Sequence, residues 1–521
     1  MRRLFANKLV IGALVALALG AQYGLAWLSH PVAAAAGPRP RLPDRAPVTA
    51  AIRACPSPGS LRGGEVALIA AAVPGSAAGP AGQAGAGTAA VSRLSAAGSA
   101  DAGQPLFART RPGVLTRARI PAATARSGRL PGGGQAAAGG KIPAGTARGG
   151  VVVRATGSMA RALEVEQTSA GGLPTAVCDG PGTDFWFVGP GQHTVASLQL
   201  YLMNADSQPA DAEVDIFTDS GPLLGSTDTG ISVPAHGLLV QSLARLLHGS
   251  RVVALHVRTS VGRLVAGLRE TSSASRPGAW LPASQPPARS LILPGLPASA
   301  GTRDLYVAVP GSGNARVKLT AVTARGSYHP TGGSGIDLPG GSAVVVALPS
   351  LAGVASAIKL TSNVPVAAAI RVSGGPPGAP GVFTSASAPV QEQGVVADNP
   401  SGPGKTTRLV LSAPRGAARV QITAEGTAAA QPGAGGQPAR VVEVAAKHTV
   451  VVRIRAPSGS RARSPFAVVI TPLAGSGPVY AGRVLTVRGT VESIFPVLTS
   501  LTSVPLLPVR NSLDAALPAL P

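Results

Sequence analysis

Four acidic side chains follow one another along a stretch that alternates polar and apolar residues, and their spacing could serve a metal ion. They are Asp211, Glu213, Asp215 and Asp219. Alternate residues of a strand share a face, so the first three carboxylates could point at one hard cation such as Ca²⁺. No glycine-bearing calcium loop frames them, however, and the residues between the first three are Ala212 and Val214. The pattern favours a solvated outer face, and we predict no metal ion and no cofactor.

The side chains that usually perform catalysis are present but not grouped. The seven histidines are scattered singly, without the H-x-x-x-H spacing of zinc enzymes. No G-x-S-x-G string marks a nucleophilic serine, and no glycine-rich phosphate loop opens a helix. We therefore predict that the chain is not an enzyme.

The two cysteines carry a different kind of chemistry. Cys55 and Cys178 each open the string C-x-x-P-G, and no C-x-x-C spacing or nearby histidine suggests a redox or metal role. An even count in an exported chain is typical of a disulfide. We predict one bond between them, which would tie the first module of the chain to the second.

The densest aromatic string is Phe185-Trp186-Phe187. In a strand Phe185 and Phe187 point one way and Trp186 the other, so Trp186 could offer a stacking platform for a sugar ring. Aromatic residues make up only 3% of the chain, which favours the alternative that all three pack in a core or between modules.

The basic surplus has two interpretations. The formal net charge is +23 over 521 residues, which could indicate a nucleic-acid partner. The basic residues are nearly all Arg among abundant Ala, Gly, Pro and Val, and no basic helix or aromatic-interleaved basic sheet accompanies them. We predict no nucleic-acid binding, and an anionic polymer of the cell surface is the better counterpart for this charge.

The N-terminus predicts the compartment. Residues 1–8 contain Arg2, Arg3 and Lys8, and an uncharged apolar run follows over 9–28, long enough to cross a bilayer. This order predicts a single membrane helix with its N-terminus in the cytoplasm and the rest of the chain outside. A signal peptide cleaved near Ala33-Ala34-Ala35 is the alternative. Residues 29–44 form a linker rich in Pro, Ala and Arg.

A repeat of about 100 residues organises the exported part. Leu200-Tyr201 and Gly230–Pro234 recur 105 positions later, as Leu305-Tyr306 and Gly335–Pro339. Apolar and polar residues alternate between Gly/Pro turns, a pattern typical of short strands in β-sandwiches. We predict an all-β chain of tandem immunoglobulin-like β-sandwich modules behind the N-terminal helix. The modules cover 45–75 joined to 149–172, then 173–275, 288–375 and 380–490.

Two segments fall outside this pattern. Residues 76–148 are rich in Ala, Gly, Ser, Pro and Arg and show no periodicity, and such a composition cannot bury enough apolar surface to offset its ordering entropy. We predict a disordered insertion that splits the first module. Residues 491–521 form an apolar tail broken by prolines, which we expect to add edge strands to an earlier module.

A resemblance rests on several of these strings. The run from Cys178 to Gly189, the run Leu200–Asn204, the closing Pro478–Gly482 and the tail Ile494-Phe495-Pro496 resemble a family of exported actinobacterial proteins known only as a domain of unknown function. The resemblance spans most of the exported region and omits the predicted insertion. It implies a cell-envelope protein and supplies no catalytic residue, substrate or cofactor.

These observations predict a non-enzymatic envelope protein that acts as a structural or protein-interaction scaffold. Its partners would be other envelope proteins, with membrane attachment through residues 9–28. The alternative is a binding module for cell-wall carbohydrate or an anionic envelope polymer.

Overall fold

The computed structural model describes most of the exported region. The described residues are 20, 45–56, 64–71, 87–94, 112–120, 149–168, 173–223, 230–272, 278–298, 301–348, 351, 353–373, 381–427, 439–458, 460–461 and 463–505. The segments predicted over 1–8, 9–28 and 29–44 lie outside them, Gly20 excepted. Among the described residues, no helix is long and apolar enough to cross a membrane.

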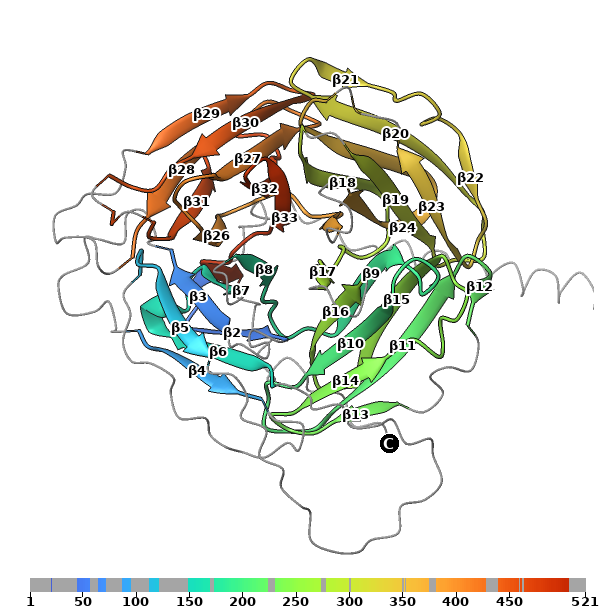
Figure 1. Ribbon diagram of the computed structural model, residues 1–521, viewed down its shortest axis with the longest axis horizontal. Helices are drawn as coiled ribbons and strands as arrows, with labels where there is room; N and C mark the ends of the chain where they lie inside the picture. The colour runs from blue at the N-terminus through green and yellow to red at the C-terminus, as the bar shows by residue number, and fades with distance from the viewer. Residues whose placement is uncertain are drawn as a thin grey trace, which may run out of the picture. The chain divides into compact units, whose positions relative to one another are not determined.

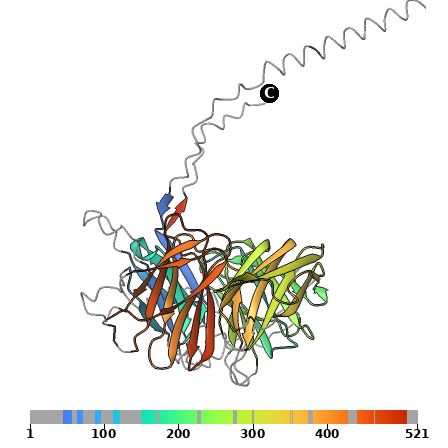
Figure 2. The same ribbon diagram turned by 90° about the horizontal axis from the view of Figure 1, so that it is seen from above.

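The chain divides into two compact units, one formed by residues 1–46 with 504–521 and the other by 47–503. Apart from Gly20, the described part of the first unit lies in β1 (Arg45–Pro47) and β34 (Ser503–Pro505), which pair in a two-stranded sheet and appear side by side in Figure 2. All the modules belong to the second unit.

The predicted all-β class is confirmed, with antiparallel sheets throughout the second unit. The sheets come in pairs, and each pair encloses a hydrophobic core. Alternation along the strands follows from this layering, since one face of each strand lies on the core. In β11 (Ala210–Thr218), for example, every second residue is buried.

The first module has two sheets that share the core around Val66, Val153 and Val165. One sheet contains β2 (Ala50–Cys55), β6 (Val151–Thr156) and β4 (Ala89–Arg93) in that order. The other contains β5 (Thr116–Ile120), β3 (Gly64–Ala70), β7 (Leu163–Thr168) and β8 (Pro174–Val177). A short 3-10 helix, η2 (Gly157–Met159), precedes β7.

The prediction of a wholly disordered insertion over 76–148 is wrong for two parts of that range. Strands β4 and β5 lie within it, and Val91 and Ala118 from these strands are buried in the core of the first module. Short strands of Ala, Arg and Ser lack a strong alternation, and tertiary pairing with β6 and β3 supplies what local propensity does not. The rest of 76–148, apart from 87–94 and 112–120, lies outside the described residues.

The second and third modules repeat one arrangement. One sheet of the second module contains, in order, β14 (Leu238–Ser242), β10 (Ser197–Met203), β16 (Val265–Thr271) and β17 (Ala279–Leu281). The other contains β12 (Gly221–Pro222), β11, β15 (Val252–Val261) and β9 (Asp184–Pro190), and the short strand β13 (Ile231–Val233) also pairs with β11. The third consists of β18 (Ala288–Leu296), β19 (Thr302–Val309), β20 (Ala315–Thr323), β21 (Gly326–Tyr328), β22 (Ile336–Leu338), β23 (Ser342–Leu348), β24 (Ser356–Ser373) and β25 (Val382–Ser385). The 18-residue β24 corresponds to β15 and β16 of the second module joined into one strand, because its first half pairs with β20 and its second half with β19.

The fourth module again has two sheets around one core. One contains β26 (Gly394–Asn399), β31 (Phe466–Pro472), β28 (Ala418–Glu425) and β29 (Arg440–Val444), and the other β30 (His448–Ile454), β27 (Lys405–Ala413), β32 (Tyr480–Val487) and β33 (Thr490–Val497). The apolar residues from 491 onward therefore complete the last strand of this module's own sheet, as far as Val497. Residues 506–521 lie outside the described residues.

All four modules share one topology. Counted in chain order and without the short added strands, the first, fifth and third strands form one sheet, and the fourth, second, sixth and seventh form the other. In a constant-type immunoglobulin domain the first, second, fifth and fourth strands share a sheet instead. The modules therefore differ in strand order from a constant-type immunoglobulin domain, and alternation could not have shown this, since it specifies faces and turns but not which strands become neighbours.

Within residues 47–503 the modules pack head to tail and close on themselves (Figure 1). The sheet that carries a module's first and fifth strands packs on the sheet that carries the second and sixth strands of the next module. Tyr201 of β10 meets the first module in this way, Tyr306 of β19 meets the second, and Tyr480 of β32 meets the third. The fourth module completes the cycle, because Val395 and Ala397 of β26 pack on β3 of the first.

Candidate functional site

A cavity lies where the first, second and fourth modules converge. Sheet-edge strands such as β2, β8, β9, β17 and β33 line it together with the inner strands β10 and β16. The cavity has a volume of about 50 Å³, which is room for ordered water or one small group. Most of the wall is apolar, and aromatic rings come from Phe187, Trp280 and Phe495.

One carboxylic acid, Asp179, stands in this wall. It directly follows the disulfide-bonded Cys178, and its backbone oxygen accepts a hydrogen bond from the amide of Ala54 on β2 at 2.9 Å. That bridge fixes the residue at the junction of the first module's two sheets. The Asp179 carboxylate makes no hydrogen bond with any described residue, and Arg53 is the cation whose charge acts on it.

Behind the cavity wall, β7 carries two buried glutamates, while Asp179 itself is partly exposed. Glu164 is 8% exposed and Glu166 is 1% exposed. Both alternate with Leu163 and Val165, which face the core of the first module, so the glutamates point to the opposite face. Strand β26 of the fourth module covers that face, as the hydrogen bond from the Ala397 amide to Glu166 at 3.0 Å shows.

Ion pairs continue from the glutamates across the interface between the fourth and first modules. The Arg483 guanidinium lies 3.1 Å from the Glu166 carboxylate, with both side chains buried. Arg117 of β5 donates to both carboxylate oxygens of Asp398 at 2.6 and 2.8 Å. Arg117 also reaches Glu65 at 3.0 Å.

Burial shifts the acids of this cluster toward their neutral forms. It raises the pKa of Glu164 from 4.5 to about 8, against the opposing charge of Arg53. It raises the pKa of Glu166 to about 7, although Arg483 favours the ionised form. The pKa of Asp179 rises from 3.8 to about 6 for the same reason, again opposed by Arg53. Such shifts collect at functional sites and also at structural ion-pair clusters.

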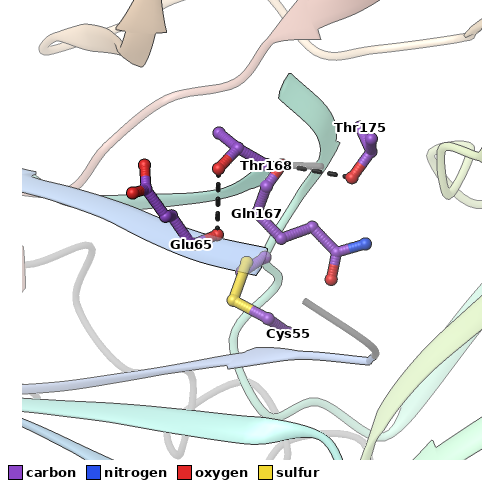
Figure 3. The surroundings of a disulfide bond; sticks show 6 residues. Cys55, Glu65, Gln167, Thr168 and Thr175 are labelled. Carbon is purple, nitrogen blue, oxygen red and sulfur yellow. Dashed lines mark hydrogen bonds between the residues drawn. A yellow bond between two sulfur atoms is a disulfide. The ribbon is translucent and has the colours of Figure 1, made fainter. Parts of the chain in front are cut away.

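The disulfide between Cys55 and Cys178 is confirmed. Its predicted place between the first and second modules is wrong, because β8 belongs to the first module and both sulfurs lie in that module's core. The bond joins the end of β2 to the end of β8 and so links the module's two sheets. In the surroundings drawn in Figure 3, Thr168 donates to the Glu65 carbonyl oxygen and Thr175 to that of Gln167, each at 3.2 Å.

The structure places Trp186 where a sugar could not reach it. The side chain is 4% exposed and packs against Tyr306 in the interface between the second and third modules. The His256 ring stacks on the indole with centroids 4.0 Å apart, and Phe217 lies 6.2 Å away. Packing between modules, the alternative use of this ring, is what the structure shows.

The acidic residues of β11 lie on a solvent-facing strip of the second module. Asp215 and Glu213 pair with Arg258 at 3.1 and 3.3 Å, and Asp215 also lies 3.4 Å from His256. Asp219 accepts a hydrogen bond from the Arg251 amide. No group of three or more metal-ligating side chains occurs among the described residues.

These features define an all-β protein of four head-to-tail modules that enclose a buried ionic cluster beside a small aromatic-walled cavity. The chain belongs to DUF5719, a family of unknown function whose model matches residues 132–455. That span includes the whole of the second and third modules and parts of the first and fourth. No curated protein matches the chain.

Proposed function

We propose that this chain is an exported, non-enzymatic protein of the cell envelope that serves as a rigid scaffold for other envelope proteins. The observation that carries the proposal is the closed cycle of modules. Each module is held by two neighbours through apolar interfaces, so its exposed strands and turns keep fixed relative positions. Fixed positions are what a surface needs in order to engage several partners at once.

Export is supported by the disulfide. Bonds of this kind persist in oxidising compartments and are rare where thiols are kept reduced. The bond between Cys55 and Cys178 lies in the core of the first module, where it helps to hold two sheets whose connecting segments are long.

Photo-crosslinking in living cells tests the scaffold role. A photoreactive residue at Val261, which is 55% exposed at the end of β15, should capture discrete exported proteins. The same residue at Val257, fully buried in the same strand, is the matched control and should capture none. Failure to capture an exported protein from Val261 and from comparable exposed positions on the other modules would contradict the proposal.

A second candidate, binding of an anionic envelope polymer, is favoured by the charge of the fourth module. Residues 394–497 contain twelve Lys or Arg and four Asp or Glu. Arg408 and Arg453 stand opposite each other on β27 and β30, Arg455 directly follows the end of β30, and all three are exposed. None of the three makes an ion pair with a described residue, so their charge is available to a phosphate- or carboxylate-bearing polymer.

Co-sedimentation with isolated cell walls tests this candidate. Retention that falls with salt and is lost on changing Arg408, Arg453 and Arg455 to Gln would support it. The matched control changes three exposed arginines of the second and third modules to Gln: Arg245, Arg251 and Arg325. Equal loss in both triple variants would show that net charge alone is responsible and would remove the fourth module as the site.

A further inference from the structure

The outer face of the third module carries positive charge beside its junction with the fourth module. Lys318 of β20 stands opposite Thr361 of β24, and Lys359 lies two residues before Thr361 on the same face. Lys318 is exposed and Lys359 is partly exposed, and neither makes an ion pair with a described residue. The acid at the edge of this face is Asp337 of β22, and Arg316 already lies 3.9 Å from it.

The fourth module adds another cation to this face. The Arg415 guanidinium, which follows β27, donates to the Ser290 hydroxyl of β18 at 3.3 Å. Ser290 stands beside Thr361, so Lys318, Thr361 and Ser290 form a row across β20, β24 and β18 (Figure 1). Adjacent strands lie about 4.8 Å apart, so the row is about 10 Å long at the backbone. Positive charge stands at both ends of this row, with hydroxyl groups between.

The same face of the second module has its charges balanced. Its outward residues on the corresponding strands β11 and β15 include Glu213, Asp215, His256 and Arg258. Glu213 lies 105 positions before Lys318, which is the interval of the repeat. Asp215 stands likewise where the third module has Thr320. Both acids pair with Arg258, at 3.3 and 3.1 Å. The third module has lost these two acids, so its lysines are available to an anionic ligand.

We propose that this row, with Lys359 beside it, binds the phosphate groups of a linear phosphodiester polymer. Phosphate oxygens accept hydrogen bonds from ammonium, guanidinium and hydroxyl groups, and Lys318, Arg415 and Ser290 supply one of each. Charge spread over about 10 Å suits a chain with several phosphates better than one isolated anion. The proposal deepens the second candidate function, on whose envelope location it rests, but it places the polymer at a different site from residues 408, 453 and 455.

Fluorescence anisotropy of a fluorescein-labelled glycerol phosphate oligomer, titrated with the full chain at low salt, measures this binding. The triple variant Lys318→Gln, Lys359→Gln, Arg415→Gln should bind at least about tenfold more weakly, as expected when charged contacts are lost. The matched control removes the same charge from exposed arginines between other strands, by changing Arg245, Arg251 and Arg488 to Gln. It should change the affinity less than about twofold, because these charges are distant and screened.

A third triple variant separates this site from the one proposed on the fourth module. Changing Arg408, Arg453 and Arg455 to Gln should leave binding of the oligomer within about twofold of the unaltered chain. Loss of binding in this variant alone would overturn the present proposal and leave the second candidate function standing. Equal loss in all three triple variants would show that net charge alone is responsible, which would overturn both sites.

Other probes test the class of polymer on the unaltered chain, so they decide the matter even if a variant fails to fold. A glutamate oligomer of equal charge should bind more weakly, and equal binding would overturn the assignment to phosphate. Phosphatidylglycerol vesicles should not displace the oligomer, whereas displacement would assign the site to a lipid headgroup. Oligothymidylate should bind no more tightly than the glycerol phosphate oligomer, because no exposed aromatic ring in the row offers a base a surface to stack on. Tighter binding of oligothymidylate would assign the site to nucleic acid and overturn the proposal.

Discussion

Replacing Arg483 by Met tests whether the fourth module is held to the first by the buried ion pair. Arg483 is fully buried, and its guanidinium lies 3.1 Å from Glu166, which is 1% exposed. It also donates to the Asp398 backbone oxygen at 3.3 Å and lies 4.4 Å from the Phe495 ring centroid. Methionine fills much of the same volume but leaves the Glu166 carboxylate without its partner.

The expected loss of unfolding free energy follows from the unpaired Glu166 carboxylate. Removing one member of a buried pair costs about 3–5 kcal/mol, because the other charge stays in a poorly solvated place. The loss should be larger at pH 8 than at pH 5. Burial already raises the pKa of Glu166 to about 7, and without Arg483 it rises further, so at pH 5 the acid is neutral in the folded variant at little cost.

Urea denaturation of the full chain, followed by tryptophan fluorescence, measures this loss. Arg419→Met is the matched control, since Arg419 pairs with Glu443 at 3.2 Å but both side chains are more than half exposed. An exposed pair is worth at most about 1 kcal/mol. The double variant Arg483→Met with Glu166→Gln should recover part of the loss, because no unpaired charge remains. If Arg483→Met at pH 8 costs no more than Arg419→Met, the pair does not hold the ring closed.

Three further outcomes are expected. Burial raises the pKa of Glu164 from 4.5 to about 8, so its contribution to stability is complete below pH 4.5 and is lost as pH rises through 8. Glu164→Gln should therefore flatten the decline of unfolding free energy over this interval by up to about 5 kcal/mol, and exposed Glu443→Gln should leave the decline unchanged. Cys178→Ser removes the disulfide that closes a loop of 123 residues, and it should lower the free energy of unfolding by about 5 kcal/mol in the chain-entropy model. A thermal midpoint equal to that of the unaltered, disulfide-bonded protein would refute this. Trp186→Ala should cost about 3–5 kcal/mol by leaving a cavity between two modules, and an unchanged denaturation midpoint would show that the interface does not depend on the indole.

The sequence predicted the strands well where one face is buried in a module's own core. Ala212, Val214 and Ile216 alternate with acids on β11, and the structure buries the three apolar residues. The pairing of the two cysteines also followed from their number and setting. Both predictions depend on local pattern or simple counting, which the sequence carries directly.

The ionic cluster could not be predicted in the same way. Leu163-Glu164-Val165-Glu166 has the alternation of a strand with one wet face, but β26, more than 200 residues later, covers that face. Period-two alternation says which side chains share a face and nothing about what packs on it. The partner Arg483 is likewise one of many arginines, and no local feature distinguishes it from Arg419 on the surface.

The ring also bears on how a chain of this kind can change over evolution. Linear arrays of repeats gain and lose copies readily, because each repeat contacts only its neighbours and the ends are free. A head-to-tail interface that closes after four copies has a rotation between neighbours that suits four and no other number. An extra module would leave the contact between Ala397 and β3 unmade, so copy number in a closed relative should be invariant while loops vary in length.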